Sequence, residues 1–136
     1  MNMNASATNH ARQTVFLVDD SDVMRQHLAQ LVQKVPGVRV VGEAELACDA
    51  IYTIRRLKPT VVVLDIAMPG GSGLEVLEAI RRESHHPTVI MLTNFSQDSF
   101  RERCVEMGAD HFLDKLTQIN QLPEIIANLG ELVEAA

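Results

Sequence analysis

The sequence has few cysteines, the residues whose disulfide bonds stabilise small extracellular domains: it contains only Cys48 and Cys104. The two lie far apart and belong to no CxxC or Cys/His pattern. Neither a disulfide framework nor a structural zinc site is therefore indicated. We interpret both as reduced core thiols of a cytosolic protein.

Long apolar runs are also missing. Every uninterrupted apolar stretch is far shorter than the ~20 residues that a membrane-spanning helix needs. Residues 1–13 are polar and contain no apolar segment of the kind found in secretory signals. We therefore expect no membrane insertion and a cytoplasmic location.

An excess of basic residues is absent as well, since the formal net charge is -6. Binding to nucleic-acid phosphates or to anionic membranes needs a basic face, so we expect no direct contact with nucleic acid.

A chain of 136 residues suits one domain. The polar start predicts a flexible lead-in over residues 1–12 and one folded domain over residues 13–136.

What is present is an alternation of short apolar runs with amphipathic stretches. The runs at 15–18, 61–64 and 89–92 are continuous and rich in β-branched residues, which indicates strands buried on both faces. Weaker strands are predicted at 38–41 and 111–113. Helical spacing predicts five helices, two of them opened by the capping boxes Ser72-x-x-Glu75 and Ser99-x-x-Glu102. The pattern predicts an α/β, flavodoxin-like (βα)5 fold, with a doubly wound five-stranded parallel sheet in the order 2-1-3-4-5.

Polar residues follow the predicted strands at the edge where such sheets bind ligands. Asp19 and Asp20 follow the first strand, Asp65 follows the third, Thr93 ends the fourth, and Lys115 follows the fifth. The first and third strands are neighbours in the expected order, so the three aspartates should converge. Their mutual repulsion, about 1–4 kcal/mol per pair at ~4 Å, would be relieved by a hard divalent cation. Oxygen ligands favour Mg²⁺ or Mn²⁺ over zinc.

A carboxylate beside such an ion is a competent nucleophile toward phosphorus, because the ion neutralises charge on both reacting groups. Lys115 would supply a positive charge to the phosphoryl oxygens. The Thr93 hydroxyl could donate a hydrogen bond to the product. These residues predict an aspartyl-phosphate site at Asp65.

The whole set resembles the receiver domain of two-component response regulators, in particular the stand-alone, chemotaxis-regulator-like type. The resemblance covers residues 13–134 and rests on four motifs: VDD at 18–20, LDIAMPGGSG at 64–73, MLT at 91–93 and FLDK at 112–115. It implies a phosphoacceptor signalling domain rather than an enzyme acting on other substrates. The phosphoryl group would reach Asp65 from a histidine kinase or a histidine phosphotransfer protein.

The resemblance also implies roles for single residues. Asp20 would bind Mg²⁺ directly, Asp19 mainly through water, and the backbone carbonyl of Ala67 would be a further ligand beside Asp65. Thr93 and Phe112 would form a switch pair, in which the ring turns inward when the hydroxyl is drawn to the phosphate. The altered surface would then bind a downstream protein.

Some positions depart from the family pattern. Leu116 stands where receivers usually have proline after the lysine, and Asn94 stands where they usually have a small residue. Ala67 and Phe95, which occupy the two positions that tune phosphate hydrolysis in this family, are both apolar. We expect slow loss of phosphate, because neither side chain can position an attacking water.

Other functions remain open at the level of sequence. The chain could be a phosphorelay intermediate, which would transfer phosphate rapidly and reversibly to a histidine protein. It could be the receiver half of a longer DNA-binding regulator. A Mg²⁺-dependent phosphatase is disfavoured because the DxDxT motif is absent: Asp65 is followed by Ile-Ala-Met.

Overall fold

The computed structural model describes residues 12–68, 71–94 and 98–135, so that most of the expected lead-in, and Phe95, lie outside the described residues. Five strands form one sheet in the order β2-β1-β3-β6-β7, and every neighbouring pair is parallel. Counted along the chain, this is the predicted order 2-1-3-4-5. The strands are β1 (Gln13–Val18), β2 (Val38–Ala44), β3 (Val61–Leu64), β6 (Thr88–Thr93) and β7 (His111–Asp114).

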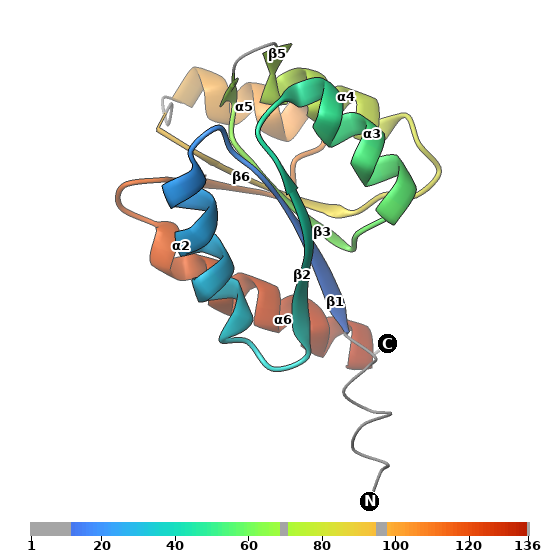
Figure 1. The fold of residues 1–136 in the computed structure, drawn as a ribbon, viewed down its shortest axis with the longest axis vertical. Coiled ribbons are helices and arrows are strands. Elements are labelled where there is room, and N and C mark those ends of the chain that lie inside the picture. The colour runs from blue at the N-terminus through green and yellow to red at the C-terminus, as the bar shows by residue number, and fades with distance from the viewer. Residues whose placement is uncertain (1–11, 69–70, 95–97, 136) are drawn as a thin grey trace, which may run out of the picture.

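Helices cover both faces of the sheet (Figure 1). On one face, α3 (Ala47–Leu57), α4 (Gly73–Arg81) and α5 (Asp98–Glu106) contribute to one core cluster. On the other face, α2 (Asp22–Gln33) and α6 (Leu122–Ala135) contribute to a second. Alternate residues of each central strand enter the two clusters: Phe16 and Val18 join the first, whereas Val15 and Leu17 join the second. This two-sided burial explains why the strand sequences are continuously apolar.

Three short elements were not predicted. β4 (Ala67–Met68) and β5 (Gly71–Ser72) form an antiparallel pair between β3 and α4, and the 3-10 helix η1 (Ile119–Gln121) precedes α6. Each is too short to leave a periodic pattern in the sequence. The first pair brings the chain back from the end of β3 to the start of α4.

The helix starts agree with prediction at α4 but not at α5. The Ser72 hydroxyl accepts from the Leu74 amide at 3.0 Å, and Glu75 accepts from the Ser72 amide at 2.8 Å, so this capping box is confirmed. The second predicted box is wrong, because α5 already includes Asp98 and Ser99 therefore lies inside its first turn. A side chain within the helix cannot act as the N-cap residue.

The interpretation of both cysteines as core thiols holds only for Cys104. Cys104 is fully buried in the core, and burial raises the pKa of its thiol. Cys48 is exposed, because α3 turns its neighbours Ala47 and Ala50 toward the core instead. In the part of the chain that the structure describes, no helix combines the length and apolar character needed to cross a membrane.

Candidate functional site

The predicted site residues meet at the carboxyl edge of the sheet. Asp19 directly follows β1 and Asp65 directly follows β3, and these two strands are paired through Val18 and Leu64. The Asp19 amide donates to the Ala44 carbonyl at 3.1 Å, and the Asp65 amide donates to the Val18 carbonyl at 3.0 Å. Both backbones are therefore continuations of the sheet, which fixes where their side chains begin.

Asp19, Asp20 and Asp65 form an acidic cluster. Each offers a carboxylate oxygen, and these oxygens lie within 4.8 Å of one another. Asp19 and Asp65 are buried, whereas Asp20 is exposed to solvent. A cleft opens beside them, lined by Asp19, Asp20, Ser21, Met24, Asp65, Ala67, Asn94 and Lys115. The cluster is thus accessible on one side and enclosed on the other.

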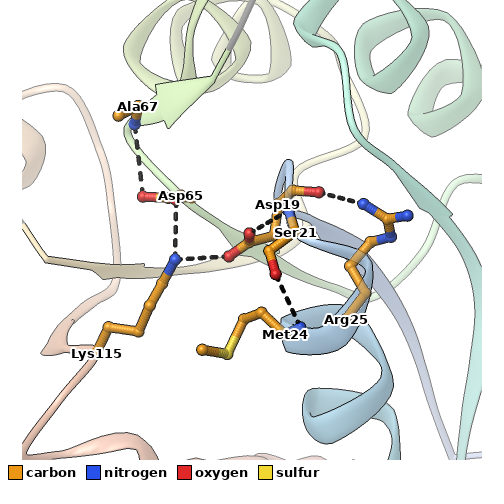
Figure 2. A network of polar contacts seen from close by, with 7 residues as sticks. All are labelled: Asp19, Ser21, Met24, Arg25, Asp65, Ala67 and Lys115. Atoms are coloured by element: carbon orange, nitrogen blue, oxygen red, sulfur yellow. Dashed lines mark hydrogen bonds and ion pairs between the residues drawn. The ribbon is translucent and has the colours of Figure 1, made fainter.

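Lys115 joins the two buried carboxylates. Its Nζ atom donates to Asp19 Oδ2 at 2.7 Å and to Asp65 Oδ2 at 2.9 Å (Figure 2). Burial by itself would lower the pKa of Lys115, but the hydrogen bonds to Asp19 and Asp65 outweigh it, so the pKa lies above its ordinary value. The lysine is therefore protonated and places one positive charge between two buried carboxyl groups. Leu116, which follows it, is 81% exposed.

Local backbone contacts orient the two carboxylates. Asp19 Oδ1 accepts from the Ser21 amide at 2.9 Å, and Asp65 Oδ1 accepts from the Ala67 amide at 3.4 Å. Ala67 thus stands beside Asp65 at the rim of the cleft, where the resemblance to receiver domains implies a metal-binding carbonyl. Gly73 packs directly against the main chain of Asp65: a Cβ added to Gly73 would lie 1.9 Å from the Asp65 carbonyl oxygen. Only glycine leaves room for the Asp65 backbone at this position.

Arg25 belongs to the same network and was missed at the sequence level. Its guanidinium is buried and donates to the Asp19 carbonyl at 2.5 Å, to Glu43 Oε1 at 2.5 Å and to Asp22 (Figure 2 shows the first of these contacts). Burial would lower the pKa of Arg25, but these acidic partners raise it above its ordinary value. A signal existed: Arg25 falls one helical turn before Leu28, on the face of α2 that turns inward.

Thr93 and Phe112, the predicted switch residues, lie on β6 and β7, which follow β3 in the sheet order. Thr93 ends β6, is fully buried and directly precedes Asn94, which is exposed and lines the cleft. Phe112 lies on β7 opposite Met91 and is 6% exposed. Phe95 lies outside the described residues. The structure therefore brings the three aspartates, Ala67, Asn94 and Lys115 to one cleft and leaves the Phe112 ring in the core.

The cluster suits a hard divalent cation. Its donors are carboxylate oxygens only, with one exposed member, Asp20, and an open side that leaves space for water and phosphate. This combination fits Mg²⁺ or Mn²⁺, and it lacks the nitrogen and sulfur ligands that zinc prefers.

The comparisons with known proteins agree with this geometry. Residues 15–127 match the family model of the response regulator receiver domain. The response regulator GacA of Pseudomonas protegens is 33% identical over 112 residues, which cover 82% of this chain and 53% of GacA. The response regulator UvrY of Escherichia coli is 34% identical over 101 residues, covering 74% of this chain and 46% of UvrY. The chain thus spans about half the length of these relatives.

Solved structures give the same result for the fold. The response regulator domain of Thermotoga maritima CheB superposes with a TM-score of 0.78 at 26% identity, over 91% of this chain and 97% of that domain. A LuxR-family two-component response regulator from Aurantimonas superposes with a TM-score of 0.81 at 28% identity, over 88% of this chain and 85% of the other. The chain belongs to the response regulator receiver domain family.

Proposed function

We propose that the chain is a phosphorylation-dependent signalling switch whose acceptor is Asp65, with residues 13–136 forming the receiver domain. The observation that carries this proposal is the buried triangle of Asp19, Asp65 and Lys115, in which Lys115 Nζ lies 2.7 and 2.9 Å from the two carboxylates. Burying two carboxylates at the mouth of a cleft costs folding stability, and a role in binding or catalysis would account for that cost. Perturbed, paired charges of this kind cluster at functional sites.

The chemistry follows from the positions of these groups. A carboxylate oxygen of Asp65 attacks the phosphorus of a phosphohistidine, the P–N bond breaks, and the imidazole nitrogen leaves with the electron pair and takes up a proton. Asp19, Asp20, Asp65 and the Ala67 carbonyl would hold Mg²⁺, which when bound neutralises charge on the carboxylate and on the transferred oxygens. Lys115 exchanges a carboxylate contact for a phosphoryl oxygen, since its ammonium already lies against Asp65.

The response would pass through Thr93 and Phe112. A phosphoryl group on Asp65 would attract the Thr93 hydroxyl, and the Phe112 ring, which is 6% exposed in this structure, would be held inward beside the space that the hydroxyl leaves. Such a two-state element is biased by a charge added at one site. The surface of α5, β7 and α6 would then change its affinity for a downstream protein.

The partners in this proposal are a cytoplasmic histidine kinase or histidine phosphotransfer protein and an unknown downstream protein, without direct contact to nucleic acid. A second candidate is the receiver part of a DNA-binding regulator. It is favoured by the relatives' lengths, and one of them, 32% identical over 119 residues, is the transcriptional regulatory protein LiaR of Bacillus subtilis. A phosphorelay intermediate would differ from both by rapid, reversible transfer to a histidine protein.

Acetyl phosphate with MgCl2 tests the acceptor. Intact-protein mass spectrometry should show one added phosphoryl group on the wild type and none on Asp65→Asn, which keeps the shape of the side chain but is not a nucleophile. Asp49→Asn is the matched control, because Asp49 is exposed on α3 and lies outside the cleft lining, and it should accept phosphate normally. Absence of added mass on the wild type, or equal addition to Asp65→Asn, would disprove the proposal.

A further inference from the structure

Arg25 contacts the main chain on both sides of Asp20. Its backbone amide donates to the Ser21 carbonyl at 3.0 Å, and its Nη1 atom donates to the Asp19 carbonyl at 2.5 Å, the contact drawn in Figure 2. Asp20 lies between these two carbonyls and is the exposed member of the acidic cluster. Among the described residues, no hydrogen bond or ion pair reaches the Asp20 carboxylate. The position of this carboxylate therefore depends on the main chain that carries it.

We infer that Arg25 is a positioning residue for the divalent-cation site: it fixes the Asp19–Asp20 peptide so that the Asp20 carboxylate stays beside those of Asp19 and Asp65. The inference rests on the proposed function, of which the cation site is a part. It adds to that function a residue to which neither the sequence motifs nor the comparisons give a role.

The planar peptide bond explains how a contact at one residue places the side chain of the next. The Asp19 carbonyl and the Asp20 amide belong to one rigid unit, so a bond that fixes the carbonyl oxygen also fixes the orientation of the Asp20 main chain. On the other side of Asp19, its amide is already bonded to the Ala44 carbonyl at the end of the sheet. Without the guanidinium, the Asp19–Asp20 peptide could rotate beyond this anchor, and the Asp20 carboxylate would move with it.

The guanidinium is itself held in one orientation. Its Nε atom donates to Glu43 Oε1 at 2.5 Å and its Nη2 atom donates to Asp22, so that three different nitrogen atoms have three different partners. The residue is 8% exposed. The donors of a guanidinium form a fixed planar fork, whereas a lysine has a single nitrogen on a flexible stem. Only arginine can therefore hold the Asp19 carbonyl while its own direction is set by two acids.

The arrangement that Arg25 holds suits a cation. One oxygen from each of Asp19, Asp20 and Asp65 lies within 4.8 Å of the others. Ligands on opposite sides of one Mg²⁺ ion lie about 4 Å apart, so only small movements are needed to bring all three to the ion. A displaced Asp20 would have to be ordered again on binding, and that ordering opposes binding. Loss of a group that orients metal ligands weakens metal binding about 10–100-fold. We expect the lower value, because the main-chain bond from Arg25 to Ser21 remains.

A purely electrostatic role would have the opposite sign. The Arg25 charge is paired with Asp22 and Glu43. Its removal would leave both acids unbalanced near the acidic cluster, and their negative charge would strengthen the binding of a cation. The direction of the change in Mg²⁺ affinity therefore separates a positioning role from a role as a charge.

Titration with MgCl2, followed by the NMR signal of the Ala67 amide, measures this affinity. Arg25→Met/Glu43→Gln has the formal net charge of the wild type, and we expect it to bind Mg²⁺ about tenfold more weakly. Arg25→Met alone should bind several-fold more weakly, and Arg25→Lys should show a smaller loss. Arg39→Met is the matched control, since Arg39 is exposed on β2, the strand that carries Glu43, and its affinity should equal that of the wild type.

A second measurement uses the metal-free proteins. The backbone order parameter of Asp20, from nitrogen-15 relaxation, should fall in Arg25→Met. That of Asp65 should stay unchanged, because its amide is bonded to the Val18 carbonyl in the sheet. If Arg25→Met does not fold, Arg25→Lys decides the question by the same two readouts.

Unchanged or tighter Mg²⁺ binding by the charge-matched double variant, or by Arg25→Lys where the methionine variants do not fold, would overturn the inference. An Asp20 order parameter equal to that of the wild type would also overturn it. In both cases the wild type binds Mg²⁺ and the proposed function stands. Failure of the wild type itself to bind Mg²⁺ would overturn the proposed cation site together with this inference.

Discussion

Lys115→Met is the most informative single change, because the structure defines what it leaves behind. The substitution keeps the aliphatic stem and removes the ammonium from Asp19 and Asp65, whose side chains are only 2% and 7% exposed. Removing one partner of a buried ion pair destabilises a protein by about 3–5 kcal/mol. Each kcal/mol shifts Tm by about 3–5 °C in a domain of this size, so the expected loss is about 10–20 °C.

The response to Mg²⁺ separates this reasoning from a general packing defect. In the wild type, an added cation must compete with Lys115 for the Asp19 and Asp65 oxygens. In Lys115→Met the same oxygens have no positive partner, and binding to the folded state alone raises stability. We therefore expect MgCl2 to raise the Tm of the variant more than that of the wild type.

Thermal unfolding followed by circular dichroism, in EDTA and in saturating MgCl2, measures both effects. Lys34→Met is the control, since Lys34 is exposed at the end of α2 and its loss should change neither Tm nor the Mg²⁺ response. The reasoning is refuted if Lys115→Met melts with the wild type in EDTA, or if Mg²⁺ stabilises the two proteins equally.

Three further predictions concern the same site. Gly73→Ala should destabilise the fold by about 1–3 kcal/mol and abolish labelling by acetyl phosphate, because its Cβ would displace the Asp65 carbonyl; thermal melts and mass spectrometry measure the two effects. Because the folded-state pKa of Lys115 is raised, its contribution to stability is complete below the unfolded pKa of about 10.4 and is lost as the pH rises through the higher folded pKa. Urea unfolding between neutral and strongly alkaline pH should therefore show a steeper loss above about pH 10.4 for the wild type than for Lys115→Met. Phosphate on Asp65 should be lost slowly, since Ala67 and Phe95 are apolar; decay of labelled protein within seconds would contradict this.

The acidic cluster could be predicted from the sequence because it depends on strand ends. Asp19 and Asp65 each follow a continuous apolar run, and a parallel sheet brings the carboxyl ends of its strands to one edge. The assumed strand order then made the two runs neighbours, as observed in the pairing of β1 with β3. Both faces of the sheet are buried, so the runs were long enough and apolar enough to recognise.

Other features depend on which side chain reaches which partner, and local patterns do not contain that information. Arg25 finds Glu43 on a different element, and Arg101 finds the Phe112 ring across a helix–strand contact. The start of α5 was misplaced because Asp98 and Ser99 are both residues that favour helix N-termini, and spacing alone could not choose between them. Cys48 is exposed because of the way α3 is rotated about its axis. The spacing of apolar residues in the sequence defines that rotation only to within one residue position.

The close approach of Gly73 to the Asp65 main chain has a consequence for how this protein could diversify. Main-chain hydrogen bonds from Asp19 and Asp65 hold the floor of the cleft, and Gly73 leaves the Asp65 backbone no room to shift, so the position of Asp65, the proposed acceptor, does not depend on a bound partner. Ser21, Asn94 and Leu116 stand around it with exposed side chains. If the proposed function holds, evolution or design can therefore alter the rate and the partner choice of phosphorylation at these three exposed positions, while the buried residues beneath them stay unchanged.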